Sequence, residues 1–98
     1  MKNSEKTLNI IYSAIDDINQ ELPKKQQIGK DPDENIFGDK GKLDSLGLVN
    51  LIVAIEGKIY DELEENIVIA NEKAMSMKNS PFRTVGSLND FIMELLDE

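Results

Sequence analysis

Cysteine, histidine and tryptophan are all absent from this sequence of 98 residues. Without cysteine the chain has no disulfide bonds and no thiolate zinc site, so its hydrophobic core must supply its stability. Without histidine it lacks the side chain that most often acts as a general base, and with it the usual means of activating a serine nucleophile. We therefore expect a protein that is not an enzyme and binds no metal ion.

Long hydrophobic runs are absent as well. No segment contains the roughly 18 consecutive apolar residues needed to span a bilayer, and residues 1–10 lack the apolar core and cleavage site of a signal peptide. These absences predict a cytoplasmic protein without a transmembrane segment. A chain of 98 residues is also too short for two domains. We expect one domain, residues 1–98, and a monomer.

Positive charge is scarce, because 11 Lys and Arg residues stand against 19 Asp and Glu residues and the formal net charge is -8. Nucleic acid and anionic membranes are therefore disfavoured as partners, since both require Lys and Arg to neutralise phosphate. The acidity is concentrated between residues 44 and 65, where six acidic residues accompany a single lysine, Lys58. Such a run is most often a solvated helix end, but it also suits basic protein partners.

Two segments have the hydrophobic spacing of amphipathic helices. In the first, about residues 5–22, large apolar residues recur every three or four positions, and Pro23 ends the pattern. In the last, about residues 85–96, the same spacing follows Thr84 or Ser87, either of which can cap the helix. Both segments are predicted to pack one face against a common core.

The segment between them begins with a long loop, residues 23–43, which is polar except for a few apolar residues such as Ile36 and Phe37. We expect these two residues to anchor the loop to the core. Asp44 then caps a helix of about residues 45–59, whose apolar residues cover more than one side, as in a central helix. A connector and a short third helix, about residues 66–78, complete an all-α fold of four helices.

Part of the loop begins like a calcium site. Asp31, Asp33 and Asn35 alternate as in an EF-hand loop. The glycine and the bidentate glutamate that such a loop needs are replaced by Ile36 and Lys42. We therefore predict no calcium site here.

Ser45 is the residue with the most informative position. It opens the central helix, where free N–H groups and the helix dipole favour a phosphate group. No histidine is present to make this serine a catalytic nucleophile. Ser45 is thus either an ordinary first-turn residue or a site at which another enzyme attaches a group.

The residues around Ser45 resemble the attachment motif of acyl carrier proteins. The resemblance rests on Leu43-Asp44-Ser45-Leu46, followed by Val49, Leu51 and the pair Ile55-Glu56. The order of elements is also similar, with a leading helix, a long loop with Ile36, Phe37 and Gly38, and Thr84-Val85-Gly86-Ser87-Leu88 opening the last helix. The resemblance covers the whole chain and implies an acyl-carrier-type four-helix bundle with a short third helix.

The resemblance implies that Ser45 carries 4'-phosphopantetheine, donated by coenzyme A through a phosphopantetheinyl transferase. The arm would bear an acyl group as a thioester for fatty acid or specialised acyl or polysaccharide biosynthesis. Asp44 and Leu46 would assist attachment, and Leu46 and Val49 would contact partners. Acids from Glu56 onward, including Asp61 and Glu62, would attract basic rims of a loading ligase and of downstream acyl-transferring enzymes.

One departure from the family pattern leaves the cargo and the class open. The exposed side of the central helix holds uncharged residues such as Gly47 and Asn50 where fatty acid carriers have acids, which indicates a specialised pathway. An aminoacyl carrier of the D-alanine type, used in cell-wall modification, fits the same motif. A helical acidic adaptor without any arm is the alternative from another class.

Because glycine weakens a helix, Gly47→Ala is predicted to stabilise the chain unless a partner or the arm needs the space.

Overall fold

The computed structural model describes residues 2–38, 41–70 and 80–97, and within them the fold is all-helical, as predicted. It contains three α-helices, α1 (Lys2–Asn19), α2 (Ser45–Leu63) and α4 (Val85–Asp97), and a short 3-10 helix, η1 (Lys24–Gln26). The described residues form no strand beyond an isolated bridge between Asn35 and Thr84. The short helix predicted around residues 72–77 lies outside the described residues.

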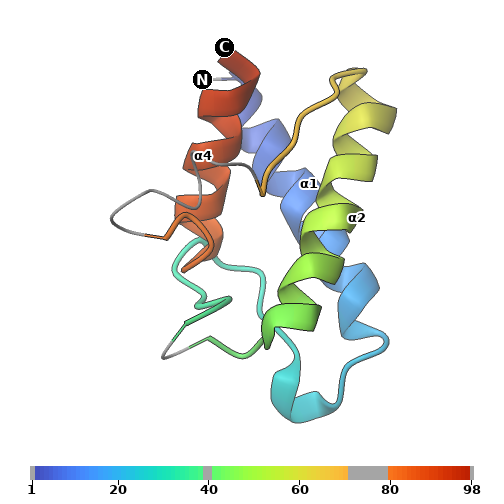
Figure 1. Ribbon diagram of the computed structural model, residues 1–98, viewed down its shortest axis with the longest axis vertical. Coiled ribbons are helices and arrows are strands. Elements are labelled where there is room, and N and C mark those ends of the chain that lie inside the picture. The colour runs from blue at the N-terminus through green and yellow to red at the C-terminus, as the bar shows by residue number, and fades with distance from the viewer. Residues whose placement is uncertain (1, 39–40, 71–79, 98) are drawn as a thin grey trace.

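Helix α1 packs against both α2 and α4, and the three helices enclose one core (Figure 1). Each helix contributes the apolar stripe expected from its spacing. The fully buried side chains include Ile11 and Ile15 of α1, Leu51, Ile55 and Ile59 of α2, and Leu88 and Ile92 of α4. A buried hydrogen bond from Thr7 to Asn89 joins α1 to α4, and an ion pair of 2.8 Å between Lys58 and Asp17 joins α2 to α1.

The helix ends differ from the predicted ones by up to one turn. Helix α1 ends at Asn19 rather than near residue 22, because its last turn tightens into hydrogen bonds from Glu21 N–H to Ile18 O and from Leu22 N–H to Asn19 O. Helix α2 continues to Leu63, beyond the expected residue 59. It ends where Glu64 adopts a left-handed conformation with φ 55° and donates its N–H to Tyr60 O.

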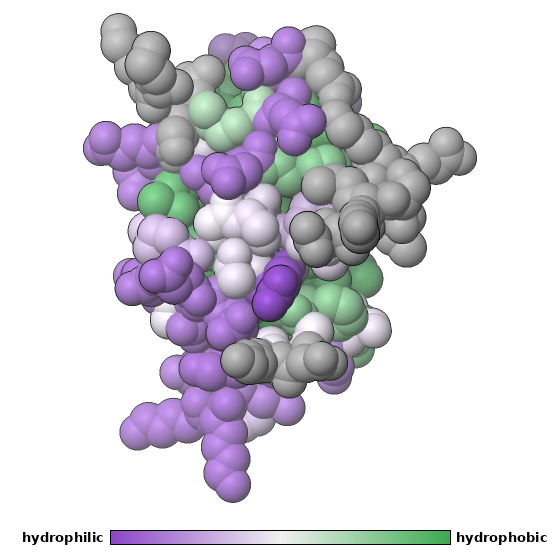
Figure 2. All heavy atoms as spheres, turned by 90° about the vertical axis from the view of Figure 1, so that its left-hand side faces the viewer, coloured by the Kyte–Doolittle hydropathy of each residue, from purple (hydrophilic) through white to green (hydrophobic). Residues whose placement is uncertain are grey.

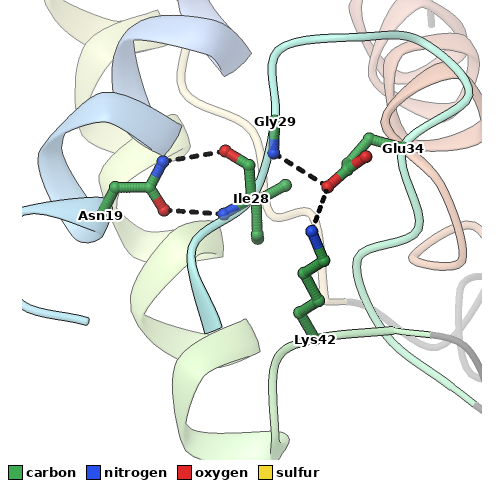
Figure 3. Close-up of polar contacts among 5 residues, drawn as sticks. All are labelled: Asn19, Ile28, Gly29, Glu34 and Lys42. Carbon is green, nitrogen blue, oxygen red and sulfur yellow. Dashed lines mark hydrogen bonds and ion pairs between the residues drawn. The ribbon is translucent and has the colours of Figure 1, made fainter. Parts of the chain in front are cut away.

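The loop after α1 is held by the Asn19 side chain, which bonds both backbone groups of Ile28 (Figure 3). The amide Nδ2 donates to Ile28 O at 2.8 Å, and Ile28 N–H donates to Oδ1 at 2.9 Å. Gln27 Nε2 donates to the carbonyl of Asn19, the last residue of α1, and to that of Leu22, which follows the helix. These bonds turn the chain back toward the core and place Ile28 in it with 3% exposure.

The second half of the loop is bonded to the start of α4. Ile36 N–H donates to Arg83 O at 2.8 Å, and Leu43 N–H donates to Ile36 O at 3.0 Å. Ile36 is fully buried, whereas Phe37 is half-buried against the core. Ile36 therefore links the segment before α4 to the residues that lead into α2.

Glu34 ties the two halves of the loop together, since its Oε2 accepts hydrogen bonds from Gly29 N–H at 2.9 Å and from Lys42 Nζ at 3.1 Å (Figure 3). The Gly29 N–H, aided by Lys42 and opposed by partial burial, holds the pKa of Glu34 below its ordinary value of 4.5. A carboxyl with a lowered pKa stabilises the fold at pH values above the unfolded-state pKa, and this contribution is lost as pH falls through the folded-state pKa.

Glu34→Gln is therefore expected to make the free energy of unfolding less dependent on pH below 4.5. Urea unfolding of both proteins at neutral pH and at several acidic pH values measures this. Asp33→Asn is the control, because Asp33 is an exposed neighbour whose carboxylate bonds neither Gly29 nor Lys42. Equal flattening of the pH profile by both variants would contradict the role of Glu34.

Candidate functional site

Ser45 is the first residue of α2, and Asp44 before it caps the helix as predicted. Asp44 is extended, with φ -85° and ψ -176°, and its Oδ1 accepts a hydrogen bond from Gly47 N–H at 2.8 Å. Its backbone oxygen accepts the N–H of Leu48 at 2.9 Å. Both Asp44 and Ser45 are exposed. The cap therefore fixes the backbone at Ser45 while leaving its side chain accessible.

Two N–H groups at the start of α2 have no hydrogen-bond acceptor in the described part of the chain. Among the residues that the structure describes, no group accepts a hydrogen bond from the N–H of Ser45 or Leu46. These donors lie at the positive end of a 19-residue helix. An anionic group on the Ser45 hydroxyl would have unpaired backbone donors beside it.

The start of α4 offers a contrast, because the N–H groups of its first turn have acceptors within the protein. The N–H groups of Val85, Gly86, Ser87 and Leu88 donate to Glu34 O, Pro32 O, Thr84 Oγ1 and Thr84 O, respectively. The Ser87 hydroxyl is also engaged, with Thr84 N–H and Pro81 O. Within the described residues, the start of α2 has an exposed serine and two N–H groups without an acceptor, whereas the first turn of α4 has neither.

The residues after Ser45 on the outer side of α2 are apolar and exposed. Leu46 is 70% exposed and Val49 is 53% exposed. The sequence predicted both as contact residues. It missed Val53 and Tyr60, which are 60% and 58% exposed on the same helix. A helical projection from Leu46 would have found them, because positions 46, 49, 53 and 60 fall within about 60° at 100° per residue.

Glu56 has a role that the sequence did not suggest. Its side chain is half-buried, and its Oε2 accepts a hydrogen bond of 2.8 Å from the N–H of Ile69. Ile69 is fully buried in the core. The Glu56 carboxylate thus holds the connector after α2 against the helix, while the contact with partners that was predicted for it stays a prediction.

Asp61 and Glu62 are exposed, but they lie far from Ser45. Residue 61 follows residue 45 by 16 positions of the same helix, which corresponds to about 24 Å. Figure 1 places the end of α2 at the end of the molecule that also holds both termini, opposite the start of this helix. The structure therefore brings together Asp44, Ser45, Leu46 and Val49, and it separates them from the acids.

The end of the molecule near η1 is hydrophilic and includes exposed lysines. In Figure 2 this lower end is covered by hydrophilic side chains. Residues 23–27, which include Lys24 and Lys25, are exposed there. Exposed lysines therefore lie at this end, whereas Asp61 and Glu62 are exposed in the last turn of α2.

Gly47 is crowded by its own neighbours. A Cβ at this position would lie 3.1 Å from Leu43 Cδ2 and 3.3 Å from Asp44 Oδ1. The gain in helix propensity from alanine, at most about 1 kcal/mol, is opposed by displacement of buried Leu43 and of the cap. We now expect Gly47→Ala to be no more stable than the wild type, in contrast to the prediction from sequence.

Urea unfolding of Gly47→Ala measures this effect. Gly57→Ala is the matched control, because Gly57 lies on the same helix and a Cβ there would have no described neighbour within 4 Å. Alanine at residue 57 is expected to stabilise the fold by up to about 1 kcal/mol. Equal stabilisation by both variants would contradict the crowding at Gly47.

Comparison with known proteins gave no match to any family model, to any curated protein or to any solved structure. None of the described helices is long and apolar enough to cross a membrane. Within residues 2–38, 41–70 and 80–97, no three acidic side chains cluster closely enough to hold a metal ion. The geometry around Ser45 and along α2 is therefore the feature of this protein that bears on its function.

Proposed function

We propose that this protein is a carrier that bears 4'-phosphopantetheine on Ser45 and presents a thioester-bound acyl group to partner enzymes. The observation that carries the proposal is the exposed serine at the capped start of α2, beside two N–H groups without an acceptor in the described part of the chain. The proposal includes a four-helix bundle of the acyl-carrier type, with a short helix around residues 72–77.

Attachment of the arm would give this chain a thiol, which its own side chains cannot provide. The Ser45 hydroxyl oxygen attacks the phosphorus that bears the pantetheine in coenzyme A, a P–O bond to serine forms, and the anhydride bond breaks to release adenosine 3',5'-bisphosphate. The serine proton passes to a base on the transferase, since this chain has no histidine. The arm then supplies the thiol that a sequence without cysteine cannot supply.

The residues of this chain position the arm rather than perform chemistry. Asp44 fixes the first turn of α2 through Gly47 N–H, and Leu51 and Ile55 bury the opposite side of the helix. The phosphodiester would lie beside the Ser45 and Leu46 N–H groups, where the helix dipole favours a negative charge. A rigid attachment point with a flexible arm allows successive enzymes to reach the same thioester.

The cargo is set by the loading enzyme. The first 11 residues of α2, 45–55, contain no charged side chain, which disfavours the usual fatty acid enzymes that contact acids there. A specialised acyl group or an amino acid such as D-alanine is therefore the better candidate cargo. Mass spectrometry of the loaded protein from its native cells distinguishes the two.

Incubation with coenzyme A and a promiscuous phosphopantetheinyl transferase tests the proposal. The intact mass of the wild type is expected to increase by one phosphopantetheine group. A well-folded protein, checked by circular dichroism, that gains no such mass would contradict the proposed function.

A further inference from the structure

Lys42 is the lysine nearest to Ser45 in the sequence, and a carboxylate holds its side chain. The two residues are three positions apart, so their Cα atoms lie at most about 11 Å from each other. Lys42 Nζ donates to Glu34 Oε2 at 3.1 Å, and Figure 3 shows the lysine side chain pointing toward Glu34. The Lys42 side chain is 46% exposed, so molecules in solution can reach it.

The carboxylate that holds Lys42 is itself fixed in place. Glu34 Oε2 also accepts the N–H of Gly29 at 2.9 Å, and the Glu34 side chain is 22% exposed. The backbone oxygen of Glu34 accepts the N–H of Val85, the first residue of α4. An ion pair between two free surface side chains costs entropy in both partners, whereas here one partner is already ordered. The contact between Glu34 and Lys42 is therefore expected to persist in solution.

The proposed arm brings a reactive group into this neighbourhood. An unprotonated amine attacks the carbonyl carbon of a thioester: a C–N bond forms, the C–S bond breaks, and the amine proton passes to the departing thiolate. The acyl group would then be lost to lysine as an amide, and the arm would keep a free thiol. An amine held near the thioester in the same molecule reacts faster than an amine free in solution.

We propose that Lys42 is a site of acyl transfer from the arm and that Glu34 restrains this transfer. The inference rests on the proposed carrier function. The Lys42 nitrogen must leave Glu34 and lose a proton before it can attack a thioester, and it does neither while it donates to the carboxylate. Glu34 is thus a positioning residue that protects the cargo through Lys42.

The other lysine close to the attachment segment is paired in the same way. Residues 41–65 contain only two lysines, Lys42 and Lys58. Lys58 Nζ lies 2.8 Å from Asp17 Oδ2, and this hydrogen bond raises the pKa of Lys58. A raised pKa keeps the amine protonated and so unreactive toward a thioester. Both lysines of this segment are therefore held by a carboxylate of another segment.

An acetylated arm tests the proposal on the full chain. Acetyl coenzyme A takes the place of coenzyme A in the transferase reaction with the wild type and Glu34→Gln. After incubation at mildly alkaline pH, hydroxylamine removes acetyl groups from the thioester and leaves amides. Acetylation of Lys42 blocks trypsin, so residues 41–58 appear as one peptide in place of residues 43–58. This longer peptide is expected to form about threefold to fivefold faster in Glu34→Gln.

Matched controls separate the ion pair from other effects of the substitution. Asp33→Asn removes the same charge from the same loop, and Asp16→Asn breaks the 3.1 Å pair that holds Lys30. Neither is expected to change the rate at which Lys42 is acetylated. Ser45→Ala with free acetyl coenzyme A is expected to leave Lys42 nearly unmodified, because no arm brings the thioester close.

A small thioester tests the restraint by Glu34 apart from the carrier function. S-acetyl-N-acetylcysteamine added to the protein without an arm is expected to acetylate Lys42 more slowly than Lys24 and Lys25. These two are exposed and form no ion pair within the described residues. In Glu34→Gln, Lys42 is expected to react about as fast as they do.

Different results would overturn the two parts of the proposal. Equal acetylation of Lys42 in the wild type and Glu34→Gln by the small thioester would contradict the restraint, whether or not an arm can be attached. If Ser45→Ala is acetylated at Lys42 as fast as the protein with an arm, the transfer does not come from the arm. A protein that gains no arm contradicts the carrier function and with it the transfer, but not the restraint.

Discussion

Ser45→Ala is expected to abolish attachment of phosphopantetheine while leaving the fold intact. The side chain is exposed, and no described residue is hydrogen bonded to its hydroxyl group, so little stability depends on it. The Asp44 cap bonds Gly47 N–H and not Ser45. Intact-mass measurement after incubation with coenzyme A and a transferase should give only the unmodified mass, with a urea midpoint close to that of the wild type.

Ser87→Ala is the matched control for this result, because Ser87 also lies in the first turn of a helix that follows a loop. Its hydroxyl is bonded to Thr84 and Pro81, so its loss is expected to cost about 1 kcal/mol of stability. Modification should be unaffected. If Ser45→Ala is modified as fully as the wild type, the attachment site is elsewhere.

Ile36→Ala is expected to have the largest effect on stability, about 2–5 kcal/mol. Ile36 is fully buried in a loop, and its backbone bonds both Arg83 and Leu43. Truncation leaves a cavity where the loop meets α4 and the residues leading into α2. Urea unfolding measures the loss, and slower modification of Ser45 at equal folded fraction would report the loosened loop.

Phe37→Ala provides the comparison, since Phe37 is adjacent in sequence but only half-buried. If side-chain size decided the loss of stability, truncation of the larger phenylalanine would destabilise the protein more than truncation of isoleucine. Because Phe37 is only half-buried, Phe37→Ala is instead expected to destabilise the protein less. A greater destabilisation by Phe37→Ala would show that the loop is anchored mainly through the phenylalanine.

The parts of the fold that depend on local pattern could be predicted from the sequence. The apolar spacing in the first and last helices and the Asp44 cap each act within one or two turns, and the all-α fold follows from them. The burial of Ile36 was also predictable, because an isoleucine in a polar loop has no other way to leave water.

The contacts between distant segments could not be predicted in this way. Glu56 was expected on the surface because it is charged, but the connector returns along α2 and brings Ile69 N–H to its carboxylate. The acids after residue 60 were expected to attract basic partners, and this stays a prediction. Because α2 continues past the expected residue 59 to Leu63, Asp61 lies about 24 Å from Ser45 along the helix.

The exposure of apolar residues on the outer side of α2 depends both on local pattern and on contacts between distant segments. The period of the apolar residues is visible in the sequence, but they lie on more than one side of the central helix, so the sequence alone predicted a helix contacted on several sides. In the structure α2 has one side on the core and the other, with Val53 and Tyr60, in solvent. The side that remains uncovered is set by the packing of α2 against α1.

Peptide mapping of the modified protein tests the attachment at Ser45 most directly. Trypsin cleavage after Lys42 and Lys58 releases residues 43–58, and this peptide contains a single hydroxyl side chain, that of Ser45. The phosphopantetheine mass is expected on this peptide, both after reaction with the transferase and in protein purified from its native cells. A phosphopantetheine mass found only on another peptide, or on none, would contradict the assignment.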